Sequence, residues 1–303
     1  MYNTSMRVLI VSGGNADEKE ISLMSASNVK TALKKREHFV EVFDISRGLM
    51  ELKKILINFD VIFPVLHGIE GEGGSLQKFL ETNKIKFVGS GSTACKNSWN
   101  KAIFKKICDE NKILTPKWFT INKNKIKLLK SKNNFVIKPI GNGSSVDVFI
   151  IKTKKDLKKI NFKYLFSKYK ELLIEDYIEG IEFTVGVLGN KVYPVLEIIP
   201  PQGGWFDYKN KYNNKTQEIV PTPNLNNKQV DRLQKITYRT HKLVGCKHFS
   251  RTDFIMKDNL FYILDLNTIP GLTKYSLFPK IAAAGGIPFE DLTDKLVRMA
   301  ARD

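Results

Sequence analysis

The stretch SRTDFIMKDNLFYILDLNTIPG, residues 250–271, decides the fold. Residues 250–256 and 260–267 are predicted strands, and side chains two apart on a strand share one face. Arg251 and Asp253 therefore lie on one face of the first strand, and Asp265 and Asn267 on one face of the second. If these strands pair antiparallel, Asp253, Asp265 and Asn267 meet. Three oxygen ligands without His or Cys suit Mg²⁺.

The turn after the second strand supports a ligand site. Residues 268–271 turn sharply, and Gly271 allows a ligand to approach the backbone closely. The alternative is a polar strand pair whose carboxylates lie in water. We favour the metal site, because solvation alone requires neither the amide of Asn267 nor the glycine turn.

The first third of the chain predicts a parallel sheet. Apolar runs at residues 7–12, 39–43 and 61–66 alternate with helical patterns at 17–35 and 49–57. This β-α-β-α-β order places ligands at the carboxyl ends of the strands. The turn from Gly13 to Glu18 lies at that edge, and so does His67, which is as consistent with a structural role as with ligand binding.

The middle of the chain predicts a hairpin around a glycine-rich turn. Strands at 135–138 and 146–152 flank residues 141–145, GNGSS, so this is not a strand-to-helix phosphate loop. Its backbone N–H groups and hydroxyls, with the charge of Lys138, could bind an anion. Glu175, Ile178 and Glu182 could face a ribose and a base, but on the residues alone a charged hairpin is the better interpretation. Residues 200–216 show no periodicity and predict a long functional loop.

Composition excludes several classes of protein. The chain has 303 residues, 42% of them hydrophobic, and a net charge of +18. No apolar run approaches the roughly 20 residues of a membrane helix, and no cleavable signal is visible, so we expect a cytoplasmic protein. Only eight of the 49 basic residues are Arg, which disfavours nucleic-acid binding. The three cysteines are widely spaced and form no C-x-x-C motif.

Seven collinear blocks make the chain resemble the D-alanine–D-alanine ligase family of ATP-grasp enzymes. They are GGNADEKEIS, VLHGIEGEGGSLQKFLE, VIKPIGNGSSV, IEDYIEGIEFTVGVLG, WFDYKNKY, SRTDF and LDLNTIPGLTKYSLFP. The resemblance implies an α/β ATP-grasp fold: an N-terminal parallel α/β domain (1–98), a central lobe (99–186) and a C-terminal lobe (187–303), the last two enclosing ATP. It also implies two Mg²⁺ ions, with Mn²⁺ as an alternative, and a homodimer.

The resemblance also implies a reaction and its residues. ATP activates one D-alanine as an acylphosphate, and the amine of a second D-alanine attacks it, giving a precursor of peptidoglycan. The resemblance assigns Glu18, Ser144 and Tyr212 to a hydrogen-bonded triad that closes the lid. It assigns Arg251 and the N–H of Gly271 to stabilising the tetrahedral oxyanion, and Ser276 and Leu277 to holding the carboxylate of the second D-alanine. Substrate binding adds His67 and Lys211. Nucleotide binding adds Lys101, Lys138, Ser145, Glu175, Ile178 and Glu182, and metal binding Asp253, Asp265 and Asn267.

Four positions depart from the family pattern. The family usually has Gly at Asp147, Lys at Asp176, Glu at Asp265 and Asp at Gly73. A carboxylate facing the phosphates would oppose ATP, so we expect Asp147 to point away. We expect Gly73 to soften the loop between His67 and Glu72.

Two alternatives remain open. One is a related ligase that joins another second substrate, such as D-lactate or another amino acid, although Tyr212 favours the dipeptide. The other is a catalytically weak, basic protein that binds nucleotides or nucleic acid.

Overall fold

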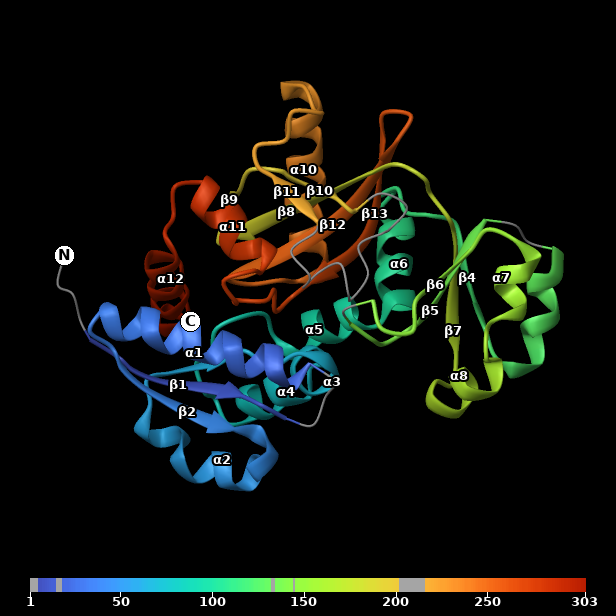
Figure 1. Cartoon of the computed structure of the whole chain (residues 1–303). Helices are drawn as coiled ribbons and strands as arrows, with labels where there is room; N and C mark the ends of the chain where they lie inside the picture. The colour runs from blue at the N-terminus through green and yellow to red at the C-terminus, as the bar shows by residue number, and fades with distance from the viewer. Residues whose placement is uncertain (1–4, 15–17, 132–133, 144, 202–215) are drawn as a thin grey trace.

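The computed structural model describes residues 5–14, 18–131, 134–143, 145–201 and 216–303. Its described strands form one parallel and two antiparallel sheets, each with helices packed against it (Figure 1). This mixed α/β architecture agrees with the fold class expected from the sequence.

The N-terminal sheet is parallel, as predicted, with the order β2-β1-β3. Its strands are β1 (Arg7–Ser12), β2 (Phe39–Asp44) and β3 (Val61–Pro64). The helices of this region are α1 (Lys19–Lys35), α2 (Leu49–Ile55), α3 (Gly68–Glu72), α4 (Ser75–Thr82) and α5 (Ser92–Trp99), with the 3-10 turns η1 (Ile45–Arg47) and η2 (Leu56–Asn58).

The alternation of side chains along β1 gives the sheet two apolar faces. Val8 and Ile10 pack on one face with α1 and with Leu296 of α12 (Phe289–Arg302). Leu9 and Val11 pack on the other face with α2 and α4. The C-terminal helix therefore completes the N-terminal core, and Figure 1 shows α12 beside α1.

The four-stranded sheet is antiparallel, with the order β4-β7-β5-β6. Its strands are β4 (Trp118–Ile121), β5 (Phe135–Pro139), β6 (Phe149–Ile151) and β7 (Leu172–Asp176), and its helices are η3 (Lys123–Ser131), α7 (Lys154–Lys158) and α8 (Phe162–Lys168). The predicted hairpin is confirmed, since β5 pairs with β6. The segment 152–170 contains the two short helices α7 and α8, and the side chain of Asn161 caps α8 by accepting from the Tyr164 N–H.

The third sheet is antiparallel, with the order β11-β10-β8-β12-β13, and β9 pairs with β8. Its strands are β8 (Ile181–Leu188), β9 (Lys191–Val192), β10 (Leu196–Ile199), β11 (Gln217–Ile219), β12 (Phe249–Lys257) and β13 (Leu260–Asn267), and its helices are α6 (Lys101–Glu110), α10 (Asn227–Val244) and α11 (Leu277–Ala284). Helices α6 and α10 contribute to the core on one face of this sheet, and α11 to the core on the other.

One expectation changes at the junction of the antiparallel sheets. The charged-hairpin interpretation of residues 172–188 is wrong, because β7 pairs with β4 and β5 while β8 pairs with β10 and β12. The chain instead crosses from one sheet to the next between Asp176 and Ile181. The domain division stays a prediction, but its boundary after residue 186 falls inside β8, which belongs to the third sheet.

No helix in the described ranges is long and apolar enough to cross a membrane.

Candidate active site

One cavity of about 610 Å³ collects the described residues to which the sequence assigns a role. Its lining includes Glu18, His67, Lys101, Lys138, Ser145, Glu175, Ile178, Glu182, Arg251, Asp253, Asp265, Asn267, Gly271, Ser276 and Leu277. These residues come from all three sheet regions, so the fold brings together positions more than 250 residues apart. Ser144, Lys211 and Tyr212 lie outside the described residues.

The strands β12 and β13 place the expected carboxylates side by side. Asp253 is opposite Asp265 and Arg251 is opposite Asn267, which confirms the antiparallel pairing. Arg251 grips Asp253 with two hydrogen bonds of 2.9 Å, from Nε to Oδ1 and from Nη2 to Oδ2. Asn267 Nδ2 donates to Asp253 Oδ2 at 3.2 Å. This bidentate geometry fixes both the guanidinium and the carboxylate.

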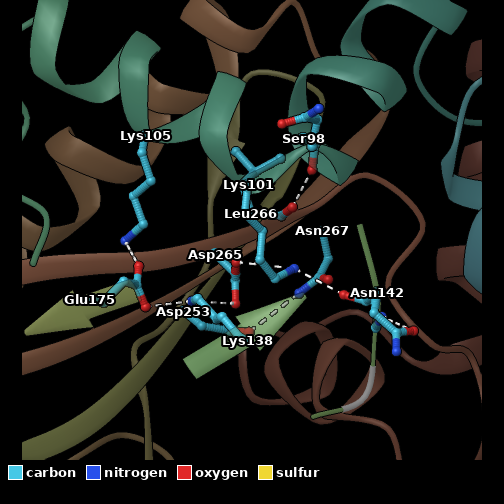
Figure 2. Close-up of polar contacts among 12 residues, drawn as sticks. Ser98, Lys101, Lys105, Lys138, Asn142, Glu175, Asp253, Asp265, Leu266 and Asn267 are labelled. Atoms are coloured by element: carbon cyan, nitrogen blue, oxygen red, sulfur yellow. Dashed lines mark hydrogen bonds and ion pairs between the residues drawn. The ribbon is translucent and has the colours of Figure 1, made fainter. Parts of the chain in front are cut away.

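A series of alternating charges runs from the buried Lys105 to the cavity (Figure 2). The lining residues Lys101, Lys138, Glu175, Asp253 and Asp265 are called the cavity floor. Lys105 Nζ lies 2.5 Å from Glu175 Oε1, and Lys138 Nζ lies 2.7 Å from Glu175 Oε2. Lys138 also faces Asp265 Oδ2 at 3.8 Å, and Lys101 faces Asp265 Oδ1 at 3.4 Å. The pairs with Asp265 are thus looser than those with Glu175.

The position of Lys105 in the fold explains why its charge is buried. Lys105 lies on the face of α6 that also carries Phe104 and Cys108, and its ammonium donates to Thr115 Oγ1 and to the carbonyl oxygen of Ile263. Its side chain is 0% exposed and that of Glu175 is 4% exposed. A buried cation requires a partner, and Glu175 supplies it.

The charges of the network shift its pKa values. Burial alone would raise the pKa of Asp265, but Lys101 and Lys138 outweigh it and lower that pKa to about 2. Burial also opposes ionisation of Glu175, and Lys105 and Lys138 overcome it and lower the pKa. Lys138 has a raised pKa because Asp265 and Glu175 more than offset its burial. Lys105 shifts the other way, because burial lowers its pKa against the opposing effect of Glu175. The shifts of Asp265, Glu175 and Lys138 favour their ionised forms near neutral pH.

At the other end of the cavity an acidic pair meets a histidine. Burial and the neighbouring carboxylate of Glu18 raise the pKa of Glu72 to about 8. Burial lowers the pKa of His67, and Arg251 acts in the same direction against Glu18. The imidazole is therefore neutral, and no described residue hydrogen bonds to its buried Nε2. This end has free capacity for a polar ligand.

Two glycines permit the close approaches that shape the cavity. A Cβ atom on Gly143, in the glycine-rich turn, would lie 3.1 Å from Glu18 Oε2. A Cβ atom on Gly271 would lie 2.6 Å from Ser276 Oγ, which also hydrogen bonds to Thr273. At Gly271 the close neighbour is thus the Ser276 side chain, and the approach of a ligand to this glycine stays a prediction.

The departures from the family pattern fall at different places. Asp147 bonds to Tyr169 and Lys168 and is not among the described residues that line the cavity, in agreement with its expected orientation. Asp176 does line the cavity. Gly73 is the C-cap of α3, so the segment after His67 is a short helix rather than the soft loop expected.

The sequence reasoning missed Lys105, Tyr169 and the pairing of Glu175. A signal for Lys105 was present, because it lies between Phe104 and Cys108 on the apolar face of its helix. Nothing in the sequence indicated that Glu175 would be held between two lysines.

The fold and this site define an enzyme of the ATP-grasp class, with two antiparallel sheets contributing to one cavity lined by lysines and carboxylates. Two family models match the chain, described as D-ala D-ala ligase N-terminus over residues 47–90 and D-ala D-ala ligase C-terminus over residues 107–298. Among known proteins, a D-alanine–D-alanine ligase of Pelagibacter ubique is 40% identical over 306 residues, covering 97% of this chain and 98% of the relative.

Solved structures of ligases resemble this chain over nearly its whole length. A D-alanine–D-alanine ligase from Bacillus anthracis complexed with ATP superposes with a TM-score of 0.85 at 28% identity, covering 98% of both chains. VanG D-Ala:D-Ser ligase from Enterococcus faecalis gives a TM-score of 0.83 at 27% identity, covering 98% of this chain and 100% of that one. The chain therefore belongs to the D-alanine–D-alanine ligase family.

Proposed function

We propose that the protein joins two D-alanine molecules in an ATP-dependent reaction that forms ADP, phosphate and D-alanyl-D-alanine for peptidoglycan synthesis. The observation that carries this proposal is the shared cavity. Lys101, Lys138 and the Asp253–Asp265 pair lie on its floor, while Glu18 and His67 line the same space. The D-alanine–D-alanine ligases reported above are named for this class of ligation.

The floor of the cavity suits the phosphoryl-transfer step. The γ-phosphoryl group passes to a carboxylate oxygen of the first D-alanine, and ADP leaves. Such transfer depends mainly on positioning and on neutralising charge, which Lys101, Lys138 and Lys211 would provide. Ser144 and Ser145 would contact the phosphates, while Glu175, Ile178 and Glu182 would contact the base and ribose.

The end of the cavity lined by Glu18 and His67 suits the attack of the amine. Glu18 and neutral His67 would hold the first D-alanine, and Ser276 and Leu277 the carboxylate of the second. Its neutral amine attacks the carbonyl carbon of the acylphosphate, the bond from that carbon to the phosphate oxygen breaks, and the proton on the nitrogen passes to the leaving phosphate. Arg251 and the N–H of Gly271 would stabilise the oxyanion, and Tyr212 would close the site with Glu18 and Ser144.

The donor set fits magnesium. Asp253 and Asp265 offer carboxylate oxygens from adjacent strands, Asn267 offers an amide oxygen, and the low pKa of Asp265 keeps it ionised. Magnesium prefers such oxygen ligands. Bound there, Mg²⁺ would neutralise charge on the phosphates. The described residues contain no group of three His, Cys, Asp or Glu placed to hold a metal, so the site relies on Asn267 and the nucleotide.

Phosphate release tests the proposal. Purified protein is incubated with ATP and Mg²⁺ and with D-alanine, L-alanine, D-serine or D-lactate as second substrate, and the product is identified by mass spectrometry. We expect D-alanine alone to give the dipeptide, L-alanine alone to give no phosphate release, and L-alanine added to D-alanine to give no mixed product. Folded protein without D-alanine-dependent release contradicts the proposal, while a preference for D-serine or D-lactate changes the second substrate only. The cytoplasmic location and the homodimer stay predictions.

A further inference from the structure

The glycine-rich turn between β5 and β6 is tied to the end of α8 by a directional set of hydrogen bonds. Tyr169 Oη donates to Asp147 Oδ2 at 2.6 Å and accepts from Asn142 Nδ2 at 3.0 Å. Lys168 Nζ adds a contact of 3.3 Å to the same Asp147 oxygen. We call Asn142, Asp147 and Tyr169 the loop clasp.

The backbone of the turn needs such support. Ser145 has a φ of 60° and Asp147 a φ of 56°, in the left-handed region that side chains other than glycine rarely adopt. The Asp147 side chain is only 14% exposed, so its carboxylate relies on these partners. Burial and the Asp147 carboxylate raise the pKa of Tyr169 to about 12, which keeps its hydroxyl protonated as a donor.

The opposite side of the same turn faces the cavity. Asn142, Gly143 and Ser145 line it, whereas Asp147 does not appear among its described lining residues. The carbonyl oxygen of Asn142 also accepts from Lys101 Nζ at 3.0 Å, and Lys101 faces Asp265 (Figure 2). The clasp therefore fixes both the turn and a lysine on the cavity floor.

We propose that the loop clasp is a positioning device for the nucleotide. It holds the turn in its ligand-facing form before the nucleotide binds, so that binding does not have to order the turn. Ordering flexible segments is a cost of binding, and preorganisation removes it. Asp147 and Tyr169 are positioning residues, since neither needs to touch the nucleotide. This inference rests on the proposed use of ATP.

The test measures nucleotide affinity without catalysis. Isothermal calorimetry with MgADP is run on the whole chain carrying Tyr169→Phe, and Tyr238→Phe is the matched control. Tyr238 lies on α10, its hydroxyl hydrogen bonds to Asn190 Oδ1 at 3.3 Å, and it is not among the described residues that line the cavity. A hydrogen bond to a charged group contributes about 1.5 to 3 kcal/mol, so we expect affinity to fall about tenfold or more in Tyr169→Phe. The control should stay within about twofold.

A second variant separates positioning from stability. Asp147→Asn keeps a residue that tolerates the left-handed conformation but weakens the bond from Tyr169. It should lower MgADP affinity as well, and adding Tyr169→Phe should then cost less than Tyr169→Phe does alone, because the two changes share the Tyr169–Asp147 bond and only the bond from Asn142 is left to lose. Variants that melt earlier but bind MgADP normally overturn the proposal, and so do additive losses in the double variant.

Steady-state kinetics separate this inference from the proposed function. The KM for ATP should rise in Tyr169→Phe, with the KM for D-alanine within about twofold of the unmodified protein. If the unmodified protein shows no D-alanine-dependent turnover but the clasp variants still lose MgADP affinity, the ligase proposal fails and the clasp stands. Normal ligase activity with unchanged affinity in the variants refutes the clasp alone.

Discussion

Lys105 lies behind the cavity floor and pairs with Glu175. Replacing this buried lysine by methionine should be among the most destabilising single changes near the cavity. The substitution keeps an unbranched side chain that is one atom shorter, and it removes the ammonium that pairs with Glu175 at 2.5 Å. Thr115 and the carbonyl of Ile263 lose the same donor. Glu175 keeps Lys138 as a partner, but one of its buried oxygens loses its cation.

The expected loss follows from burial. Both side chains are at most 4% exposed, and removing one partner of a buried ion pair costs about 3 to 5 kcal/mol. Lys106, the next residue on α6, supplies the control. Its side chain is 72% exposed and its pair with Glu110 spans 3.8 Å, so Lys106→Met should cost less than about 0.5 kcal/mol.

Guanidinium titrations at neutral pH, followed by circular dichroism, measure both free energies of unfolding. A third variant, Lys105→Met with Glu175→Gln, should lose less than the sum of the single changes, because the carboxylate left without its second cation is gone. The reasoning is refuted if Lys105→Met costs under about 1 kcal/mol, or no more than Lys106→Met.

Two further predictions concern Glu72 and Arg251, which line the cavity. The raised pKa of Glu72, about 8, means that unfolding releases a proton between about pH 4.5 and 8, so stability falls as pH rises through that window. Glu72→Gln should remove this slope in thermal melts from pH 4.5 to 9, and an unchanged slope contradicts the assignment. Arg251→Lys keeps the charge but loses the fork held by Asp253, so kcat should fall about 100- to 1000-fold if Arg251 stabilises the oxyanion. A fall of less than about threefold rules out that role.

The pairing of β12 with β13 could be predicted because its information is local. Two apolar runs close in sequence predict an antiparallel pair, but the register shifts between Asp253 and Phe254, and this irregularity sets Asp253 opposite Asp265. The parallel N-terminal sheet followed from strands that alternate with helices. Local pattern was sufficient for the pairing of these strands, but it did not show the register shift beside Asp253.

The strand pairing around Glu175 and its ion pair with Lys105 could not be predicted from local pattern. Residues 172–188 contain two strand signals with a polar connection, which fits a hairpin as well as a crossing between sheets. The partners that select the crossing are distant: β4 and β5 for one strand, and β10 and β12 for the other. Lys105 lies 70 positions before Glu175 and is its partner only in the folded chain.

The fold also determines how much of the lysine charge at the cavity is neutralised. The sequence shows an excess of lysine, but Lys105 and Lys138 are bound by Glu175 at 2.5 and 2.7 Å, so the floor is largely neutralised from within. Asp265 is the loosest member, at 3.4 and 3.8 Å from its two lysines. Phosphate oxygens competing for Lys101 and Lys138 should therefore displace Asp265 before Glu175. That order leaves the Glu175 pairs intact and makes Asp265 the carboxylate available to a divalent cation.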